Sequence, residues 1–483
     1  MRHRLRENAL CACLAGGGCA TMAWLGLYGF AWNDYEIEAK PAFEALVHGH
    51  VLRFLALAPA YGGSLVERAP FALLPGLWGG GGLAVYRAVA LPCLLAAAVL
   101  GVWIVARMRV QGRTTLARAV ALGVCVANPI TLRALELGHP EELLGACLCV
   151  AAVLVAGRSC GERDHSLLAG VLLGLAIANK EWALLAAGPV LLALPPRRRL
   201  RCVGAALVVC AAVLGPLLLA ASGGFVASTR AAAAPAASPI FQPWQVWWFF
   251  AHHGAPVHGL FGAAKPGYRV GPAWAGEISH PLILAVGLAL AGCLWLSSRR
   301  TALSEQNALL ALALVLLLRC VLDTWDTVYY PLPFVLALLA WEAGMRTRRP
   351  PVLALLASVL VWISFQWLPE HVSADAQAAI FLAWSLPFAA WLGLRLFSPG
   401  HPAGRQPRSA VSIALGGDGD PQAMTVSALG RLVSTSRESS PTTTRSSMRT
   451  PPTPGKYTPG STVTTLPARS GSSPAVRASR GAS

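Results

Sequence analysis

The chain has 483 residues, of which 55% are apolar and only 13% are charged, and its mean hydropathy is +0.55. Soluble domains usually have about 25% charged residues, so the composition excludes an ordinary soluble protein and indicates a polytopic membrane protein. The net charge of +17 does not indicate a nucleic-acid partner, because the basic residues form short clusters between apolar runs without a nucleic-acid-binding motif. Most of the 12 cysteines lie inside apolar runs, and their spacing indicates neither a disulfide framework nor a zinc site.

Apolar runs predict the membrane-spanning segments. The first follows "MRHRLREN" and lacks a clear cleavage site, so we interpret it as a retained span and not as a signal peptide. Several runs are shorter than the roughly 20 residues that cross a hydrocarbon core, so their helices are expected to be tilted, re-entrant or buried among neighbours. The sequence therefore predicts an all-α polytopic protein with about 12 spans. The runs are 9–31, 83–106, 115–133, 142–157, 166–178, 183–195, 201–221, 281–297, 305–322, 328–343, 351–367 and 376–396.

Arginine clusters orient these spans, because Lys and Arg concentrate in cytoplasmic loops. With a cytoplasmic N-terminus, every later cluster also falls inside, provided that residues 166–195 cross the membrane twice. We therefore expect a multi-pass cell-membrane protein with both termini in the cytoplasm. The clusters lie at 107–113, 158–163, 197–201, 299–300 and 346–349.

The first predicted outer loop begins with the stretch "AWNDYEIEAKPAF", which contains Asp34, Glu36 and Glu38. Pro41 suits the first turn of a helix, and the residues after it alternate between apolar and polar at helical spacing. This pattern predicts a short helix that lies in the membrane interface. We interpret Glu38, next to this helix, as a helix-start carboxylate without a chemical role.

Two further outer loops carry ionisable residues. In "ELGHPEELLG", His139 precedes Glu141, and the dipole of the next helix explains at least one carboxylate of its first turn. In "ANKEWALL", Lys180 and Glu181 separate two apolar runs. Ionisable residues at that depth are costly and indicate function, with an ion pair to a neighbouring loop as the structural alternative.

A last polar loop follows the run that ends near residue 322. In "RCVLDTWDTVYYPLP", Arg319 precedes Asp323 and Asp326, which are three positions apart and suit one side of a helical turn. Capping of the next span explains one of the two carboxylates.

The second long outer loop, residues 222–280, contains the aromatic stretch "PIFQPWQVWWFFAHHGAP". An interfacial aromatic belt explains this composition. A wall for a lipid chain, or a surface on which a sugar stacks, is the functional alternative. The residues in question are Trp244, Trp247, Trp248, His252 and His253.

The composition changes near residue 398 to Ser, Thr, Pro, Gly and Arg. This change predicts two parts, a polytopic domain over 1–397 and a disordered cytoplasmic tail over 398–483. The basic tail suits anionic lipid and its hydroxyls suit phosphorylation, and a solvated tail without a partner explains it equally well.

Soluble-enzyme motifs are absent from the sequence, which has no phosphate-binding loop, nucleophile elbow, zinc-protease motif or dinucleotide fingerprint. No cofactor or metal site is indicated, and a divalent ion stays open. The outer polar residues suit a reaction of a lipid-linked sugar phosphate, in which a carboxylate activates an acceptor hydroxyl and cations stabilise the leaving phosphate. The candidates for binding substrate and phosphate are His139, Glu141, Lys180, Glu181, Arg319, Asp323 and Asp326.

Four motifs resemble the GT-C superfamily of multi-span glycosyltransferases. They are "NDYEIEAKPAFEAL", "GHPEE", "NKEWALLA" and "DTWDTVYYPLPFVLALLAWE", and the resemblance covers roughly residues 15–395. It is strongest to glycosyltransferase family 87, which includes polyprenyl-phosphate-mannose-dependent mannosyltransferases of actinobacteria. The Arg-rich, Ala-rich composition fits a high-GC actinobacterium.

This resemblance implies a GT-C-like fold and transfer of mannose, or of another hexose or pentose, from a polyprenyl-phosphate donor. The acceptor is expected to be a lipid or cell-envelope glycan hydroxyl on the outer face of the membrane. By its place in the first outer loop, Asp34 is expected to act as general base, with Glu36 as its neighbour or substitute.

A transporter or lipid-linked-sugar flippase is the main alternative function, and a non-catalytic scaffold is a third. Transporters usually place ionisable residues near the middle of the bilayer and contain repeated halves, whereas here the polar groups collect at one rim. We predict that Asp34, His139, Lys180 and one of Asp323 or Asp326 line a single outward cavity connected to a lipid-facing groove.

Overall fold

The computed structural model of the chain describes residues 2–27, 34–159, 164–220, 240–253, 257–258, 264–265, 269–298, 301–345, 347 and 349–398. These residues lie within one unit, Met1–Gln406. The predicted disordered tail lies outside the described residues from position 399 onward.

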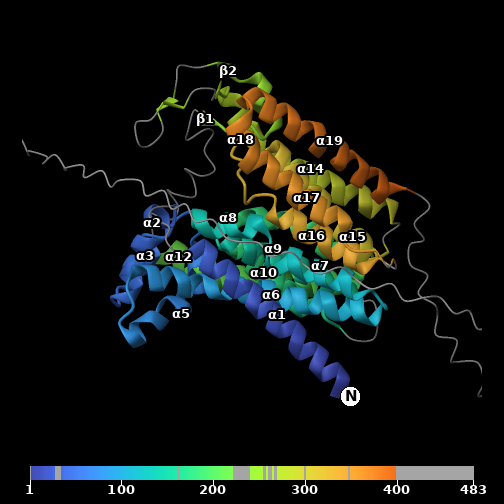
Figure 1. Cartoon of the computed structure of the whole chain (residues 1–483), viewed down its shortest axis with the longest axis horizontal. Coiled ribbons are helices and arrows are strands. Elements are labelled where there is room, and N and C mark those ends of the chain that lie inside the picture. Colours follow the sequence, from blue (N-terminus) through green and yellow to red (C-terminus); the bar gives the residue numbers. More distant parts are fainter. Residues whose placement is uncertain are drawn as a thin grey trace, which may run out of the picture. The chain divides into compact units, whose positions relative to one another are not determined.

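Helices follow the apolar runs of the first half of the chain (Figure 1). Side-chain caps mark where two of them begin. The Thr114 hydroxyl accepts a hydrogen bond from the Ala117 N–H at 3.2 Å, and Asn128 Oδ1 accepts one from the Ile130 N–H at 2.9 Å. The elements are α1 (Arg2–Leu27), α2 (Asp34–Glu38), α3 (Lys40–Val47), α4 (Val51–Ala56), α5 (Gly62–Ala72), η1 (Leu74–Trp78), α6 (Gly82–Val110), α7 (Thr115–Val126), α8 (Pro129–Leu137), α9 (Glu141–Arg158), α10 (Ser166–Asn179), η2 (Glu181–Ala186), α11 (Ala187–Ala193) and α12 (Pro196–Ala220).

The second half begins with short strands and continues as helices. One antiparallel sheet has the order β1-β5-β2, and β3 pairs with β4 in another. The elements are β1 (Ile240–Phe241), η3 (Val246–Phe250), β2 (His252–His253), β3 (Val257–His258), β4 (Ala264–Lys265), β5 (Arg269–Val270), α14 (Ala273–Ser297), α15 (Glu305–Leu322), α16 (Leu332–Gly344), α17 (Val352–Trp362), the π-helical turn η4 (Ile363–Trp367), α18 (Leu368–His371) and α19 (Ala374–Phe397).

Two helices of the second half, α15 and α16, form the centre of the core. Most of their residues are buried, and both helices pack against α9. A helix that is enclosed by other helices contacts protein and not lipid, so it need not be long enough to cross the hydrocarbon core by itself. This placement explains why α16 is only 13 residues long.

Eight helices in the described part of the chain are long and apolar enough to cross a membrane. The predicted helical membrane protein is confirmed at that level. The other predicted runs correspond to the shorter helices α10, α11 and α16 and to α9, which carries three charged residues. The total of 12 crossings, the GT-C-like arrangement and the orientation stay predictions. The eight segments are Ala9–Gly26, Gly82–Val110, Thr115–Leu137, Pro196–Ala220, Ala273–Ser297, Glu305–Leu322, Val352–His371 and Ala374–Phe397.

Glycines allow α10 and α12 to approach closely. Gly170 and Gly174 are four residues apart on one face of α10, and a Cβ at these positions would lie 2.3 Å from the Cys202 carbonyl oxygen and 2.7 Å from that of Ala206. Small residues at this spacing let the backbones of membrane helices pack against each other.

Substitution of Gly170 by valine is therefore expected to destabilise the protein by about 1–3 kcal/mol, because the new side chain forces the two helices apart. The matched control is Gly204→Val on α12, where a Cβ would meet no atom within 4 Å. Thermal unfolding in detergent measures both variants, and an equal loss of stability in the two would contradict close α10–α12 packing as the cause.

The loop predicted to be the first outer one forms several short helices, of which α3 buries Ala42, Phe43, Ala45 and Leu46. The helix predicted after Pro41 is thus present, as α3 and then α4. Its position at the membrane interface stays a prediction.

Candidate functional site

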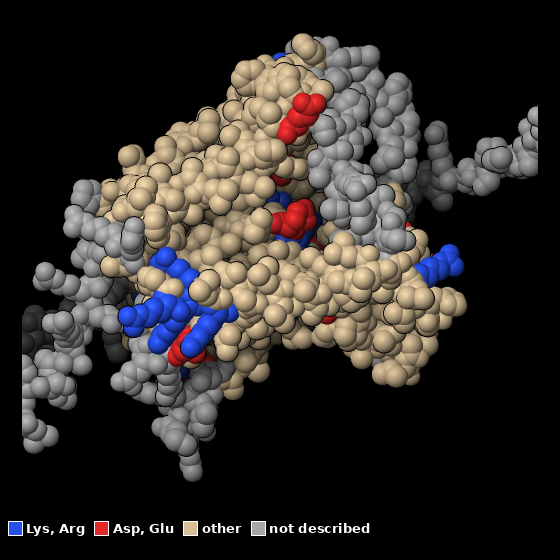
Figure 2. Space-filling view, turned by 180° about the vertical axis from the view of Figure 1, so that it is seen from behind, with Lys and Arg blue, Asp and Glu red and all other residues tan. Residues whose placement is uncertain are grey.

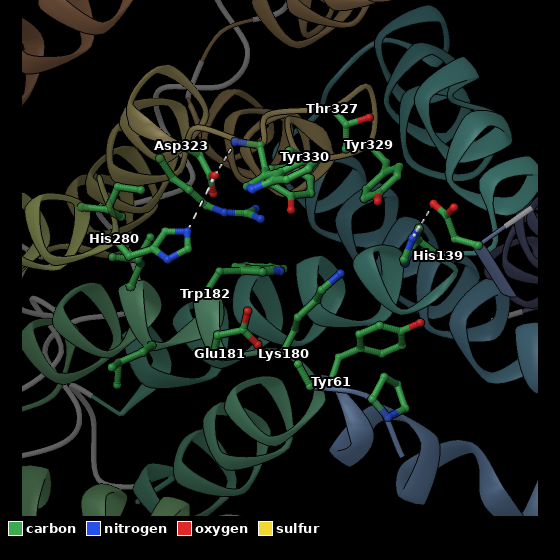
Figure 3. A pocket seen from close by; sticks show the side chains of 18 of the residues that line it. Tyr61, His139, Lys180, Glu181, Trp182, His280, Asp323, Thr327, Tyr329 and Tyr330 are labelled. Atoms are coloured by element: carbon green, nitrogen blue, oxygen red, sulfur yellow. Dashed lines mark hydrogen bonds and ion pairs between the residues drawn. The ribbon is translucent and has the colours of Figure 1, made fainter. Parts of the chain in front are cut away.

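A cavity of about 870 Å³ lies where the predicted polar loops meet (Figure 3). Its walls come from α2, the turn between α8 and α9, the junction of α10 with η2, α14, and the loop from α15 to α16. On the face shown in Figure 2, acidic and basic side chains gather in a hollow between largely uncharged surfaces. Six predicted site residues line the cavity, namely Asp34, His139, Lys180, Glu181, Arg319 and Asp323.

Gly138 sets the position of Asp34. It ends α8 with a φ of 95°, a conformation that glycine adopts without strain. A Cβ on it would lie 2.5 Å from the Tyr35 backbone nitrogen, so the missing side chain lets α2 rest on this turn. Tyr35 is buried, and its ring centroid lies 4.3 Å from that of Tyr86. The packing of Tyr35 leaves the neighbouring Asp34 carboxylate facing the cavity.

His139 connects Asp34 to a buried carboxylate. Its Nε2 lies 3.2 Å from Asp34 Oδ2, and its Nδ1 lies 2.7 Å from Glu141 Oε1. Burial lowers the pKa of His139, but the charge of Glu141 and the hydrogen bonds that the ring donates to Asp34 and Glu141 outweigh this effect and raise the pKa to about 9. The ring is therefore an imidazolium at neutral pH.

A buried ion network lies behind His139. Glu141 is fully buried, and its carboxylate oxygens lie 3.4 Å from Arg68 Nη2 and 3.5 Å from Lys180 Nζ. Lys180 also lies 2.8 Å from Glu142 Oε1. Burial lowers the pKa of Lys180, but the two carboxylates raise it overall. Lys180 is thus a cation whose charge already has two partners.

Arg319 also lines the cavity, but its surroundings differ from those of Lys180. Its guanidinium carbon lies 4.2 Å from the ring centroid of Tyr330 and 5.0 Å from that of Trp182, so it is held between two aromatic rings. The side chain is buried, yet Nη1 has no hydrogen-bond partner, and no carboxylate forms an ion pair with it among the described residues. A buried cation with an unused donor suits an anionic ligand.

Asp323 lies beside Arg319 and is held by its own loop. Its Oδ1 accepts a hydrogen bond from the Trp325 N–H at 2.9 Å and lies 3.8 Å from His280 Nε2. Burial raises the pKa of Asp323, but His280 and Arg319 hold it below its usual value. Asp323 therefore orders the turn after α15 and supplies a local counter-charge. The expected capping of the next span is wrong for Asp323, because the N-cap of α16 is Pro331 and no side chain caps that helix.

Other predicted residues do not line the cavity. Glu36 pairs with Lys40 on the surface of the first loop, and Glu141 lies behind His139. Asp326 is fully buried, and burial raises its pKa well above the usual value. Because it is buried outside the cavity lining, Asp326 is not available to a ligand in the cavity.

The three tryptophans of the aromatic loop pack against the helices and do not line the cavity, although Gln242 of the same loop does. The indole nitrogens of Trp244, Trp247 and Trp248 donate to Ser364 O at 2.9 Å, Leu322 O at 2.7 Å and Asp375 Oδ1 at 2.8 Å. These three tryptophans thus join η3 and its flanking residues to η4, α15 and α19. His252 is exposed in β2, and the His253 side chain lies outside the described part.

Apolar residues form one side of the cavity. They are Leu184 and Leu185 of η2 and Ile283 and Leu284 of α14. Leu184 is 48% exposed and Leu284 is 43% exposed. This side offers an apolar surface within the cavity that Arg319 also lines.

Several residues at the site were not predicted. Tyr61 donates a hydrogen bond to Glu38 Oε2 at 2.6 Å, and both line the cavity, as do Tyr330 and His280. Arg68 lies behind it. Tyr330 lies in the "DTWDTVYYPLP" stretch, and His280 is a polar residue at the start of an apolar run, so the sequence could have indicated both as site residues. Arg68 carried none, because an arginine in an outer loop is unremarkable in sequence.

Metal-binding clusters of three or more His, Cys, Asp or Glu side chains do not occur in the part of the chain that the structure describes. Comparison with protein-family models, curated proteins and solved structures found no match for this chain. The resemblance to the GT-C superfamily therefore stays a prediction.

Proposed function

We propose that the chain is a membrane glycosyltransferase that moves a sugar from a polyprenyl-phosphate donor to a hydroxyl of a lipid or cell-envelope glycan on the outer face. The observation that carries this proposal is that Asp34 and Arg319 line one cavity. Asp34 is a 42%-exposed carboxylate, and Arg319 is a buried guanidinium with an unused donor. A general base and a phosphate ligand are the two groups that the reaction requires.

Each group has one role in the transfer. Arg319 binds the phosphate of the donor, and Asp34 accepts the proton of the acceptor hydroxyl. The acceptor oxygen bonds to the anomeric carbon while the bond from that carbon to the phosphate oxygen breaks. The electron pair leaves with the polyprenyl phosphate, whose negative charge Arg319 stabilises.

The apolar residues of η2 and α14 suit the lipid of the donor. A cavity of about 870 Å³ accommodates a sugar phosphate and the reacting end of an acceptor. Leu184 and Leu284 line the same cavity as Arg319, so we assign the first isoprene units to this apolar side. Mannose, another hexose or a pentose fits the proposal, as do the 12-span GT-C-like fold and cytoplasmic termini.

Lipid-linked-sugar flipping is the second candidate function. It is favoured by the burial of Glu141, Glu142 and Lys180 among the helices, since buried ionisable groups mark transport pathways in membrane proteins. Their mutual pairing at 2.8–3.5 Å favours a structural role over a moving charge.

Purified protein in liposomes distinguishes the two functions. The donor probe is radiolabelled polyprenyl-phosphate mannose, followed by the glucose and arabinose analogues, with extracted cell-envelope lipids and glycans as acceptors. A transferase moves the label from the polyprenyl phosphate to the acceptor. Label that crosses the bilayer while it stays on the polyprenyl phosphate would identify a flippase and refute the transferase.

A further inference from the structure

We infer that His139 is a positioning residue that holds Asp34 from behind, and that it does not bind the donor phosphate. This inference deepens the proposed function and rests on it. It replaces the role of phosphate ligand that the sequence indicates for His139.

The hydrogen bonds of the ring carry the inference. Asp34 Oδ2 lies 3.2 Å from Nε2 and Glu141 Oε1 lies 2.7 Å from Nδ1, so both ring nitrogens face carboxylates. A neutral imidazole has a single N–H and donates to only one of them, whereas an imidazolium donates to both. With both donors in use, His139 has none left for a phosphate.

The surroundings of the ring favour the imidazolium. Asp34 from α2 and Glu141 from α9 supply negative charge, and the opposing positive charge of Lys180 is paired with Glu142. The rings of Tyr61 and Tyr329 cover its sides, with centroids at 5.8 Å and 4.6 Å. Glu141 is held in turn by Arg68 at 3.4 Å.

This bridge orients the base. One oxygen of Asp34 accepts a hydrogen bond from the His139 N–H. The other has no donor among the described residues and is the one we assign to the acceptor hydroxyl. Fixing a reacting group in this way is worth up to about 100-fold in rate when a displacement of 1 Å is avoided.

Alkaline pH breaks the bridge. The pKa of His139 is about 9, so above that pH the neutral ring keeps one N–H and releases one of its two carboxylates. The turnover number is therefore expected to fall as the pH rises through about 9.

The first test is the pH profile of sugar transfer for the wild type, His139→Asn and Glu141→Gln. We expect His139→Asn to lower kcat by about 10- to 100-fold, to leave KM for the lipid-linked donor within about two-fold, and to lose the alkaline limb. In Glu141→Gln the limb is expected to move to lower pH, because the charge that supports the imidazolium is gone. Glu44→Gln, an exposed carboxylate on α3, is the matched control and is expected to keep the wild-type profile.

Two kinetic outcomes would overturn the inference. A His139→Asn variant with an increased KM and an unchanged kcat would make His139 a phosphate ligand. Unchanged kinetics in this variant, while Asp34→Asn is inactive, would remove His139 from the reaction and leave the proposed function intact.

Thermal unfolding supplies a test that needs no activity. The folded-state pKa of about 9 exceeds the ordinary value of 6.5, so the bridge stabilises the protein fully below pH 6.5, and this contribution is lost as the pH rises towards 9. The Tm of the wild type is expected to fall over this range by roughly 2 °C or more relative to His139→Asn. Parallel curves would refute the bridge, even if the wild type transfers no sugar. If His139→Asn does not fold, Glu141→Gln takes its place in this comparison.

Discussion

Substitution of Asp34 by asparagine is expected to lower the rate of sugar transfer by about 10²- to 10⁴-fold, the usual contribution of a general base. The amide has nearly the shape of the carboxylate and still accepts a hydrogen bond from His139 Nε2, so the fold is expected to persist. It cannot take the proton of the acceptor hydroxyl. Initial rates with the labelled donor that the wild type accepts, at saturating acceptor, measure the effect.

The control for this prediction is Glu44→Gln, which removes an exposed carboxylate of the same outer loop that does not line the cavity. Glu36→Gln tests the other carboxylate proposed from the sequence. Full activity in Asp34→Asn together with an inactive Glu36→Gln would assign the base to Glu36. Full activity in both would reject a base in the first loop.

Substitution of Arg319 by glutamine is expected to reduce kcat/KM by about 100- to 1000-fold, because the leaving phosphate loses its cationic donor. The lysine variant is expected to recover only part of this loss. A lysine restores the charge, but it lacks the planar donor that fits between the Tyr330 and Trp182 rings. Steady-state kinetics over a range of donor concentrations separate binding from turnover.

Arg53→Gln is the control for Arg319, since Arg53 is an exposed arginine of α4 outside the cavity. Because Arg319 is buried, the variants are compared only after size-exclusion chromatography and thermal unfolding show folded protein. Wild-type kinetics in a folded Arg319→Gln variant would contradict the phosphate role and with it the proposed transfer.

Hydropathy predicted the positions of the helices well, since each predicted apolar run coincides with one helix or a consecutive pair. The sequence also predicted that Asp34, His139, Lys180 and Asp323 line one cavity, and all four do. The alternating crossings from which this was argued stay a prediction. Both predictions use information that is read along the sequence, namely the length of each apolar run and the positions of the arginine clusters between the runs.

Pairing inside the site was beyond the sequence. A helix that is apolar on nearly all its faces, such as α9, has no amphipathic pattern that shows which face packs against which neighbour. The contacts of Glu141 with His139, Arg68 and Lys180 depend on how α9 is rotated about its axis, and the sequence does not indicate this rotation. The same reason applies to Trp248, whose indole binds Asp375 far along the chain. Glu36 gave no sign that Lys40 would pair with it on the surface.

Gly138 has a consequence for how this chain tolerates mutation. A single methyl group at that turn would displace α2 and move Asp34 away from His139, although every charged residue of the site would still be present in the chain. The protein would keep all its reactive side chains but lose the distance between Asp34 and His139 on which the proposed mechanism depends. The most vulnerable position of the site thus belongs to a residue with no functional group, and a search restricted to reactive side chains would overlook it.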